Sequence, residues 1–452
     1  MQSGQTGQTA LVILAAGMGS RMKSNMPKVL HKVAGLSLIG HAMRSGASVS
    51  PSRTVVVTGH GVEAVEAEVA ALDGAAICVR QAEQNGTAHA VDQAREALAD
   101  FDGRVIVLYG DTPFISGETL TRMAEAKSDV VVLGFEAADP AKYGRLIADG
   151  TQLERIVEAK DASPAELKIT LCNSGVISAP AGLLFDLLAQ VGNNNASGEY
   201  YLTDIIGLAT DRGLRAEVFT CPEAETLGIN SRAQLSEAEA IFQRKAREGA
   251  MLGGVTLAEP ESVYFAYDTQ LGQDVTVAPH VVFGPGVRVD DGAEILAFSH
   301  LEGCHVGPRA QVGPYARLRP GAKLAEAAKV GNFVEIKQAE IGAGAKVNHL
   351  SYVGDASVGA AANIGAGTIT CNYDGVMKHR TEIGAKAFVG SNTLLVAPVT
   401  MGDESMTASG TVVTKDVPDG AMAIGRAKQD NKPGFAVKLM QMLRAKKKSK
   451  DK

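Results

Sequence analysis

The chain has 452 residues, of which 45% are hydrophobic and 21% charged, and its net charge is −6. Such a composition predicts a globular protein of two or three domains, and the negative charge argues against bulk nucleic-acid binding. The absence of tryptophan and an aromatic content of only 5% also argue against a platform that stacks nucleic-acid bases.

The cysteines favour a reducing compartment. They are scattered, odd in number and contain no C-x-x-C pair, which disfavours a zinc site or a disulfide scaffold. The N-terminal apolar run is too short for a signal peptide, and no stretch of 18 apolar residues occurs. The sequence therefore predicts a cytoplasmic protein. The five cysteines are Cys78, Cys172, Cys221, Cys304 and Cys371.

The first 135 residues alternate apolar strands with helical segments. This alternation is typical of an α/β sheet of mostly parallel strands with helices on both faces. In such sheets, ligands bind beyond the carboxyl ends of the strands, where Gly17, Gln81 and Asp111 are expected. Strands are predicted at 9–16, 54–58, 77–79, 104–109 and 129–135, and helices at 62–72 and 90–99.

A glycine-rich turn follows the first strand at Gly17–Gly19, with Arg21 and Lys28 just beyond it. Backbone N–H groups in such a turn can cradle a phosphate, and the two basic side chains could neutralise it. The spacing matches neither the dinucleotide-binding fingerprint nor the P-loop. The residues alone therefore fit a phosphate cradle and a plain tight turn equally well.

Asp111 directly follows the strand 104–109 and Gly110. A carboxylate in this place is a common Mg²⁺ ligand where phosphates are handled. An aspartate ahead of Thr112 and Pro113 also suits a turn or a helix N-cap. The residues alone leave both interpretations open.

Two segments frame the second half of the chain. Ser231-Arg232-Ala233-Gln234 fits a capping box, which predicts an amphipathic linker helix to about residue 248. The tail from Lys432 ends in AKKKSKDK and is predicted to be a solvated, disordered end.

Between these segments, apolar residues recur every six positions. A period of six fits neither an α-helix nor an alternating strand. It fits a chain that turns a corner every six residues, so that three hexads close a triangular coil and coils stack. A parallel β-helix is predicted over about 260–425, with function where the period breaks, around 302–305, 348–352 and 370–381. The first run is Leu271, Val277, Phe283, Val289, Ile295 and Leu301.

The motifs together resemble one enzyme family over nearly the whole chain. They are LAAGMGSRM (14–22), QAEQNGTAHA (81–90), YGD (109–111), GEYYLTD (198–204), GIN (228–230), RLRPGA (317–322), GNFVEIK (331–337), NHLSYVGDA (348–356) and NIGAGTITCNYDG (363–375). This pattern resembles the bacterial bifunctional N-acetylglucosamine-1-phosphate uridyltransferases/glucosamine-1-phosphate N-acetyltransferases.

The resemblance implies a fold and a domain plan. It implies a Rossmann-like α/β nucleotidyltransferase domain at 1–230, a linker helix at 231–250, and an acetyltransferase domain with a C-terminal tail at 251–452. The latter is expected to be a left-handed parallel β-helix of hexapeptide repeats. Family members are homotrimers through the β-helix, with each acetyltransferase site built between subunits.

The resemblance also implies the reactions. Glucosamine 1-phosphate is acetylated with acetyl-CoA, and UMP is then transferred from UTP to N-acetylglucosamine 1-phosphate with release of pyrophosphate. The cofactor is Mg²⁺, and the product, UDP-N-acetylglucosamine, serves peptidoglycan and lipopolysaccharide synthesis. The partners are these small molecules, without nucleic acid or membrane.

In the uridyltransferase domain, the resemblance assigns Lys28 and Arg21 to phosphate neutralisation in catalysis. Asp111 and Asn230 are the implied Mg²⁺ ligands, and Gln81, Gly86 and Thr87 the implied uracil contacts. The implied nucleotide and sugar contacts are Leu14, Ala15, Ala16, Gly17, Lys28, Gln81, Gly86, Thr87, Tyr109, Gly110, Asp111, Gly144, Glu158, Asn173 and Asn230.

In the β-helix, the resemblance makes His349 the general base, a role that suits a group titrating near neutrality. Arg319 and Lys337 are the implied ligands of the sugar phosphate. Position 409 is often alanine in this family and is serine here, which changes little if its backbone makes the contact. The implied substrate and acetyl-CoA contacts are Arg319, Lys337, Tyr352, Asn363, Ala366, Asn372, Tyr373, Ser391, Ser409 and Arg426.

Two rival interpretations make different demands on the sequence. A sugar-1-phosphate nucleotidyltransferase with a purely structural β-helix would have no use for His349, Tyr352 and the Asn372–Tyr373 insertion. A non-enzymatic scaffold would be expected to lose Lys28, Asp111 or Asn230. All of these residues are present.

Overall fold

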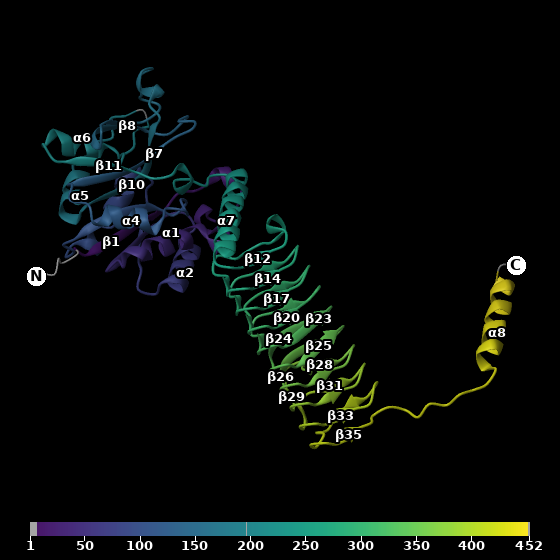
Figure 1. Ribbon diagram of the computed structural model, residues 1–452. Helices are drawn as coiled ribbons and strands as arrows, with labels where there is room; N and C mark the ends of the chain where they lie inside the picture. Colours follow the sequence, from purple (N-terminus) through teal and green to yellow (C-terminus); the bar gives the residue numbers. More distant parts are fainter. Residues whose placement is uncertain (1–6, 196, 451–452) are drawn as a thin grey trace, which may run out of the picture. The chain divides into compact units, whose positions relative to one another are not determined.

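A computed structural model describes residues 7–195 and 197–450 of the chain (Figure 1). The chain divides into two compact units, residues 1–245 and residues 246–452. The first unit contains a mixed α/β sheet, and the second contains stacked parallel coils.

The sheet of the first unit has nine strands in the order β5-β4-β1-β6-β10-β7-β11-β9-β8. Strands β5, β4, β1 and β6 are parallel, β10 runs antiparallel between β6 and β7, and β8 and β9 form an antiparallel pair. The predicted α/β, mostly parallel fold is confirmed. The strands are β1 (Thr9–Ala15), β4 (Arg53–Thr58), β5 (Ile77–Arg80), β6 (Arg104–Tyr109), β7 (Val130–Glu136), β8 (Arg145–Asp149), β9 (Gln152–Val157), β10 (Leu171–Pro180) and β11 (Ala216–Thr220).

Alternate residues of β1 pack into two different cores. Ala10, Val12 and Leu14 share one core with α3, α5 and α6, whereas Leu11 and Ile13 share the other with α1, α2 and α4. This alternation is the strand period of two, and it places helices on both faces of the sheet. The helices are α1 (Leu38–Gly46), α2 (Val62–Leu72), α3 (Thr87–Asp92), α4 (Gly117–Ala124), α5 (Ala181–Leu188) and α6 (Asp204–Asp211).

The predicted helix at 90–99 was wrong in its bounds. Helix α3 starts at Thr87 and ends at Asp92, and only a short 3₁₀ turn, Glu96–Leu98, follows. The early start is fixed by tertiary contacts, because Ala88 N–H donates to Tyr200 O (2.9 Å) and Thr87 Oγ1 accepts from Leu202 N–H (3.0 Å). Such contacts override local propensity.

The long helix α7 (Arg232–Leu252) precedes the coils of the second unit. One face of the coils is a ten-stranded parallel sheet, and the other two faces are joined through β24 and β26 (Figure 1). The ten strands are β12 (Thr256–Leu257), β14 (Thr276–Val277), β17 (Glu294–Ile295), β20 (Gln311–Val312), β23 (Lys329–Asn332), β25 (Lys346–His349), β27 (Asn363–Ile364), β30 (Phe388–Val389), β33 (Met406–Thr407) and β35 (Met422–Ala423).

The remaining two faces complete each coil. Their strands are β13 (Gln270–Leu271), β15 (Val282–Phe283), β16 (Arg288–Val289), β18 (His300–Leu301), β19 (His305–Val306), β21 (Arg317–Leu318), β22 (Lys323–Leu324), β24 (Glu335–Ile341), β26 (Tyr352–Val358), β28 (Ile369–Cys371), β29 (Thr381–Ile383), β31 (Leu394–Val396), β32 (Val399–Met401) and β34 (Val412–Val413).

The period-six residues form the core of the coils. In successive coils Val277, Ile295 and Val312 stand in register, and each is fully buried. The residue before each of them faces outward. The parallel β-helix is therefore confirmed, and the aliphatic ladder is its core.

The C-terminal tail differs from the prediction. It contains helix α8 (Phe435–Lys450), although every side chain of that helix is exposed. The predicted disorder was wrong for residues 435–450, because this part of the tail contains neither Gly nor Pro and is rich in Ala, Leu, Met, Gln, Lys and Arg, which favour helix. Among the described residues, no helix combines the length and apolarity needed to cross a bilayer.

Candidate active sites

The first candidate site is a cavity of about 350 Å³ at the carboxyl ends of β1 and β6. This is the edge of the sheet where the sequence predicted a ligand. The cavity is lined by Leu14, Ala15, Ala16, Gly17, Lys28, Val29, Gln81, Gln84, Gly86, Thr87, Ala90, Tyr109, Asp111 and Glu199. Gly110 lies directly behind it, where its N–H donates to Leu14 O (2.9 Å).

The glycine-rich turn brings Lys28 to the cavity. Gly19 has φ +62°, and a Cβ at this position would lie 2.5 Å from Lys28 Cβ. Glycine is therefore required for the chain to fold back this closely. Lys28 begins the short helix η2 (Lys28–Leu30), while Arg21 lies in η1 (Ser20–Met22), exposed and outside the lining of the cavity.

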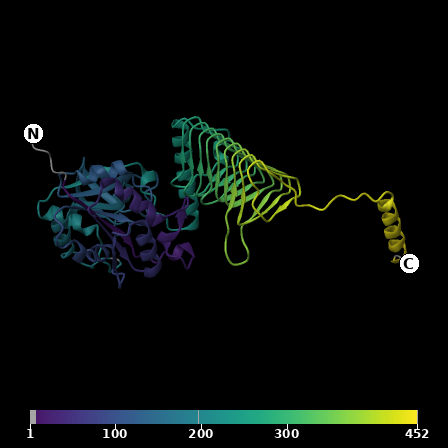
Figure 2. The same ribbon diagram turned by 90° about the horizontal axis from the view of Figure 1, so that it is seen from below.

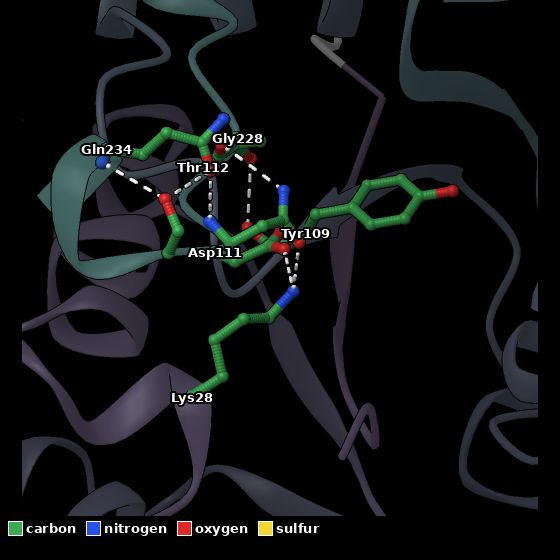
Figure 3. Close-up of polar contacts among 8 residues, drawn as sticks. Lys28, Tyr109, Asp111, Thr112, Gly228 and Gln234 are labelled. Carbon is green, nitrogen blue, oxygen red and sulfur yellow. Dashed lines mark hydrogen bonds and ion pairs between the residues drawn. The ribbon is translucent and has the colours of Figure 1, made fainter. Parts of the chain in front are cut away.

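Lys28, Asp111 and Asn230 meet at one point, and Figure 3 shows the first two of these side chains pointing toward each other. The Lys28 ammonium forms an ion pair with Asp111 Oδ2 and donates to Asn230 Oδ1 (3.0 Å). The side chains of Lys28 and Asp111 are only 14% and 16% exposed. Two oxygen atoms from distant parts of the chain thus converge on a single positive group.

The loop that carries Asn230 is fixed by its own hydrogen bonds. Ile229 N–H donates to Asp111 O (3.0 Å), which ties the two loops together. Gln234 N–H donates to Ser231 Oγ (3.3 Å), as in a capping box, but Gln234 Oε1 accepts from Asn230 N–H (2.9 Å). The start of α7 therefore holds Asn230 in place.

The QAEQNGTAHA segment forms another wall. Gln81 is buried, and its Nε2 donates to Gly86 O (3.1 Å). Gln84 Nε2 donates to Ala16 O (2.7 Å) and so links this wall to the end of β1.

The four predicted sugar contacts, Tyr109, Gly144, Glu158 and Asn173, lie close together. Asn173 N–H donates to Gly144 O (2.8 Å), and a Cβ on Gly144 would lie 3.5 Å from the Glu158 carboxylate oxygens. Burial, followed by the charges of Asp111 and Glu158, raises the pKa of Tyr109. Burial also raises the pKa of Glu158, against a hydrogen bond from Thr203 Oγ1 (3.4 Å).

Four lining residues were not assigned from the sequence: Val29, Gln84, Ala90 and Glu199. Three of them lie inside or beside quoted motifs. Gln84 belongs to QAEQNGTAHA and Glu199 to GEYYLTD. The motifs marked the right segments, but the side chain that faces the cavity depends on the loop conformation.

The second candidate site lies on the β-helix around His349, the last residue of β25. His349 is exposed, and its backbone is anchored because its carbonyl accepts from Ser351 Oγ (2.8 Å) and Gly367 N–H (3.3 Å). Asn363 begins the strand of the next coil, in register with Lys346.

Two polar clusters lie on the coils around His349, where Glu335 and Tyr352 stand in register. Asn372 is buried, and its Nδ2 donates to Tyr352 Oη (3.4 Å) and also to Asp355 Oδ2. Arg319 Nη1 donates to Glu335 Oε1 (2.7 Å). Both clusters join side chains from neighbouring coils.

The insertion after Asn372 leaves the coil as a long loop (Figure 2). Tyr373 is exposed, and its hydroxyl donates to Gly375 O (2.6 Å). The loop also carries Lys378, which the sequence did not single out. The contact with Lys378 lowers the pKa of Lys337, because two ammonium groups disfavour each other's charge. Such a pair suits an anionic ligand.

The predicted acetyl-CoA contacts form a column along one corner of successive coils. Asn392 N–H donates to Ala366 O (2.7 Å), and Gly410 N–H donates to Ser391 O (2.8 Å). Arg426 Nη1 donates to Ser409 O (3.0 Å), which joins the last two members of the column.

The first break of the period, at 302–305, contributes fewer contacts to the two polar clusters than the breaks at 348–352 and 370–381 do. Glu302 lies within electrostatic reach of Arg319. His305 contacts Asp290, with Nε2 2.7 Å from Oδ2, which lowers the pKa of Asp290 against its burial.

The chain is similar to known proteins over nearly its whole length. Residues 11–165 match the family described as the MobA-like NTP transferase domain. "Bifunctional protein GlmU" of Ruegeria sp. (strain TM1040) is 66% identical over 98% of this chain and 99% of its own length. The proteins of the same name from Dinoroseobacter shibae and Paracoccus denitrificans are 64% and 60% identical over 98% and 97% of this chain, and 99% and 98% of their own length.

Proposed function

This chain belongs to the bifunctional GlmU family, and from this premise we propose which reaction each of its two sites performs. The protein acetylates glucosamine 1-phosphate with acetyl-CoA and then transfers UMP from UTP to N-acetylglucosamine 1-phosphate. The observation that carries this function is 66% identity over 98% of this chain and 99% of the relative, because that match includes both sites.

Uridyl transfer takes place in the cavity of the first unit. A phosphate oxygen of N-acetylglucosamine 1-phosphate attacks the α-phosphorus of UTP in line, and the bond to pyrophosphate breaks. The attacking oxygen is already anionic, so no protein base is needed, and catalysis consists of positioning and charge neutralisation. Lys28 and the N–H groups of the glycine-rich turn provide the positive charge inside the cavity, and Arg21, exposed beside the turn, adds charge from outside its lining. Gln81, Gly86 and Thr87 hold the uracil.

Asp111 and Asn230 hold Mg²⁺ in this proposal. The fit rests on Asp111 Oδ2 and Asn230 Oδ1, which both reach the Lys28 ammonium and so already converge on one cation. Hard oxygen donors are the ligands that Mg²⁺ prefers. When bound, Mg²⁺ would neutralise the phosphate charge that develops during transfer.

Acetyl transfer takes place at His349. The amine nitrogen of glucosamine 1-phosphate attacks the thioester carbonyl carbon, and His349 takes the proton from that nitrogen. The carbon–sulfur bond then breaks, and the leaving sulfur takes the proton back from His349, so that coenzyme A is released as its thiol. Arg319, Lys337 and the neighbouring Lys378 bind the sugar phosphate. Tyr352, Asn363, Asn372 and Tyr373 surround the acceptor, and the column Ala366, Ser391, Ser409 and Arg426 binds acetyl-CoA.

The protein is a homotrimer through its β-helix in this proposal. Support comes from an aromatic ladder, which we define as His280, Phe298, Tyr315 and Phe333, on one corner of four successive coils. Neighbouring rings stack at 4.8, 4.8 and 5.3 Å between centroids, and the last three side chains are 48–57% exposed. A contiguous exposed apolar strip of this kind is typical of a protein–protein contact.

The domain limits and the location follow the same proposal. Residues 1–230 carry uridyl transfer, 231–250 link the domains, and 251–452 carry acetyl transfer. Because UTP and acetyl-CoA are supplied in the cytoplasm, we place the protein there.

A coupled assay tests the proposed function. Purified protein receives glucosamine 1-phosphate, acetyl-CoA, UTP and Mg²⁺, and free thiol and pyrophosphate are followed separately. Thiol is expected first, with pyrophosphate release dependent on it. If pyrophosphate appears only when N-acetylglucosamine 1-phosphate is supplied, the β-helix is structural and the single-activity nucleotidyltransferase is correct.

A further inference from the structure

Asn332 is a conspicuous residue of the GNFVEIK motif that none of the roles above explains. It is the last residue of β23 and stands in register with His349, the last residue of β25 in the next coil. The Oδ1 atom of Asn332 lies 2.7 Å from Nδ1 of His349. This contact is the side-chain hydrogen bond of the imidazole at the proposed acetyltransferase site.

The chemistry of the two groups fixes the direction of this bond. A carboxamide oxygen can only accept a hydrogen bond, so the proton must lie on His349 Nδ1. In a neutral imidazole the second nitrogen, Nε2, then carries the lone pair. Nε2 is therefore the basic atom of this ring.

We propose that Asn332 is a positioning residue for His349, whose side-chain oxygen fixes the ring orientation and selects the tautomer with a basic Nε2. This inference rests on the proposed acetyl transfer at His349. Nε2 would take the proton from the amine of glucosamine 1-phosphate as the nitrogen–carbon bond forms. A base oriented by a third group is a general feature of such sites.

The backbone around the pair supports this role. Leu350 N–H donates to Asn332 O (3.1 Å), so the two coils are joined immediately beside the side-chain bond. Phe333 and Leu350, the residues after Asn332 and His349, both turn with positive φ, at 55° and 50°. The two side chains therefore leave equivalent positions of adjacent coils, which keeps their separation fixed.

A neutral amide and a carboxylate in this place would act differently on the protonated ring. An aspartate in this place would stabilise the imidazolium and so retain the proton. The charged side chains on the strands packed against His349 are Lys329 of β23 and Lys346 of its own strand, and β27 carries none. None of these supplies a negative charge that would replace the orienting oxygen.

The test compares three variants in the full-length protein. Asn332→Ala is expected to lower kcat of acetyl transfer by about 10- to 100-fold, the usual effect of losing an orienting partner, with KM for glucosamine 1-phosphate nearly unchanged. Asn332→Asp keeps the acceptor and should be active at high pH, but the acid limb of its pH–rate profile should move to higher pH. Gln311→Ala, which removes an amide bonded to Glu294 (2.9 Å) one coil below, is the matched control and should match the wild type.

Uridyl transfer and the oligomeric state of each variant report whether it is folded. Unchanged kcat in Asn332→Ala, an effect on KM alone, or an unmoved acid limb in Asn332→Asp would overturn the inference. His349→Ala distinguishes a failure of the proposed role of His349 from a failure of the inferred role of Asn332. If it retains acetyl transfer, the assignment of His349 as the general base fails, whereas an inactive His349→Ala together with a normal Asn332→Ala refutes only the role of Asn332.

Discussion

The two candidate sites are built on opposite structural plans. The proposed uridyltransferase site is a cavity at the ends of parallel strands, and its Lys28–Asp111 pair is 14% and 16% exposed. The proposed acetyltransferase site lies on the outside of a repetitive coil, and its Arg319–Glu335 pair is 36% and 35% exposed. Water screens the second pair more strongly, so isolated charges contribute less there.

This difference in exposure indicates how each site holds its ligand. In the cavity, desolvation strengthens each charged contact, and few residues are needed. On the coil, side chains are aligned one per coil by the backbone register, and several weak contacts are required. Variants that remove one side chain from each site therefore test this difference between the two sites.

The largest effect is expected for His349→Ala. Loss of the general base should lower acetyl transfer by about 100- to 10,000-fold and leave uridyl transfer near normal, as measured by thiol release and pyrophosphate release. The exposed His300→Ala, two coils earlier on another face, is the control. Parallel loss of both activities would show that the sites are not independent.

Asp111→Ala should give the reverse pattern. Removal of a group that neutralises and orders the phosphates should lower uridyl transfer by about a hundredfold or more and change its dependence on Mg²⁺ concentration. Acetyl transfer should persist, and the exposed Asp149→Ala should behave like the wild type. An unchanged Mg²⁺ dependence would contradict the assignment of Asp111 as a ligand.

A smaller effect is expected for Tyr315→Glu in the aromatic ladder. A charge in the middle of the apolar strip should weaken each subunit contact by about 2 kcal/mol, roughly thirtyfold in dissociation constant. Light scattering should detect smaller species, with acetyl transfer reduced more than uridyl transfer. Tyr264→Glu, an equally exposed aromatic outside the ladder, is the control; a stable trimer in Tyr315→Glu would exclude the ladder as the contact.

The smallest effect concerns the half-buried carboxyl group of Glu158. Burial raises its pKa in the folded state, so the folded protein loses stability as pH rises through and above the unfolded value near 4.5. Glu158→Gln should therefore unfold at a higher temperature than the wild type at pH 7, and the difference should vanish below pH 4. An equal difference at both pH values would show that titration is not its cause.

The sequence predicted the repeated features of the coils and the position of residues that follow the ends of parallel strands. Residues such as Val277 and Ile295 face inward because the coil geometry recurs every six residues, and Gly17 and Asp111 share an edge because parallel strands end together. Contacts that depend on loop conformation were not predictable. Lys378 reaches Lys337 only through a long insertion, and Gln84 faces the cavity only because its loop folds back onto Ala16.

The tail and the start of α3 illustrate a second limit. Helix α3 begins at Thr87 because of a hydrogen bond to a segment more than 100 residues away. Helix α8 forms from local propensity although its charged end suggested disorder. The start of α3 was mispredicted because tertiary contacts set it, and the tail was mispredicted because local helix propensity was underestimated.

The column of corner residues has a consequence for ligand length. Ala366, Ser391, Ser409 and Arg426 occupy successive coils, and adjacent strands are spaced by about 4.8 Å, so the column spans roughly 14 Å. Contacts to an elongated cofactor are therefore spaced by one coil, about 4.8 Å. Deleting one coil would shift the contacts at the far end of the ligand by this distance.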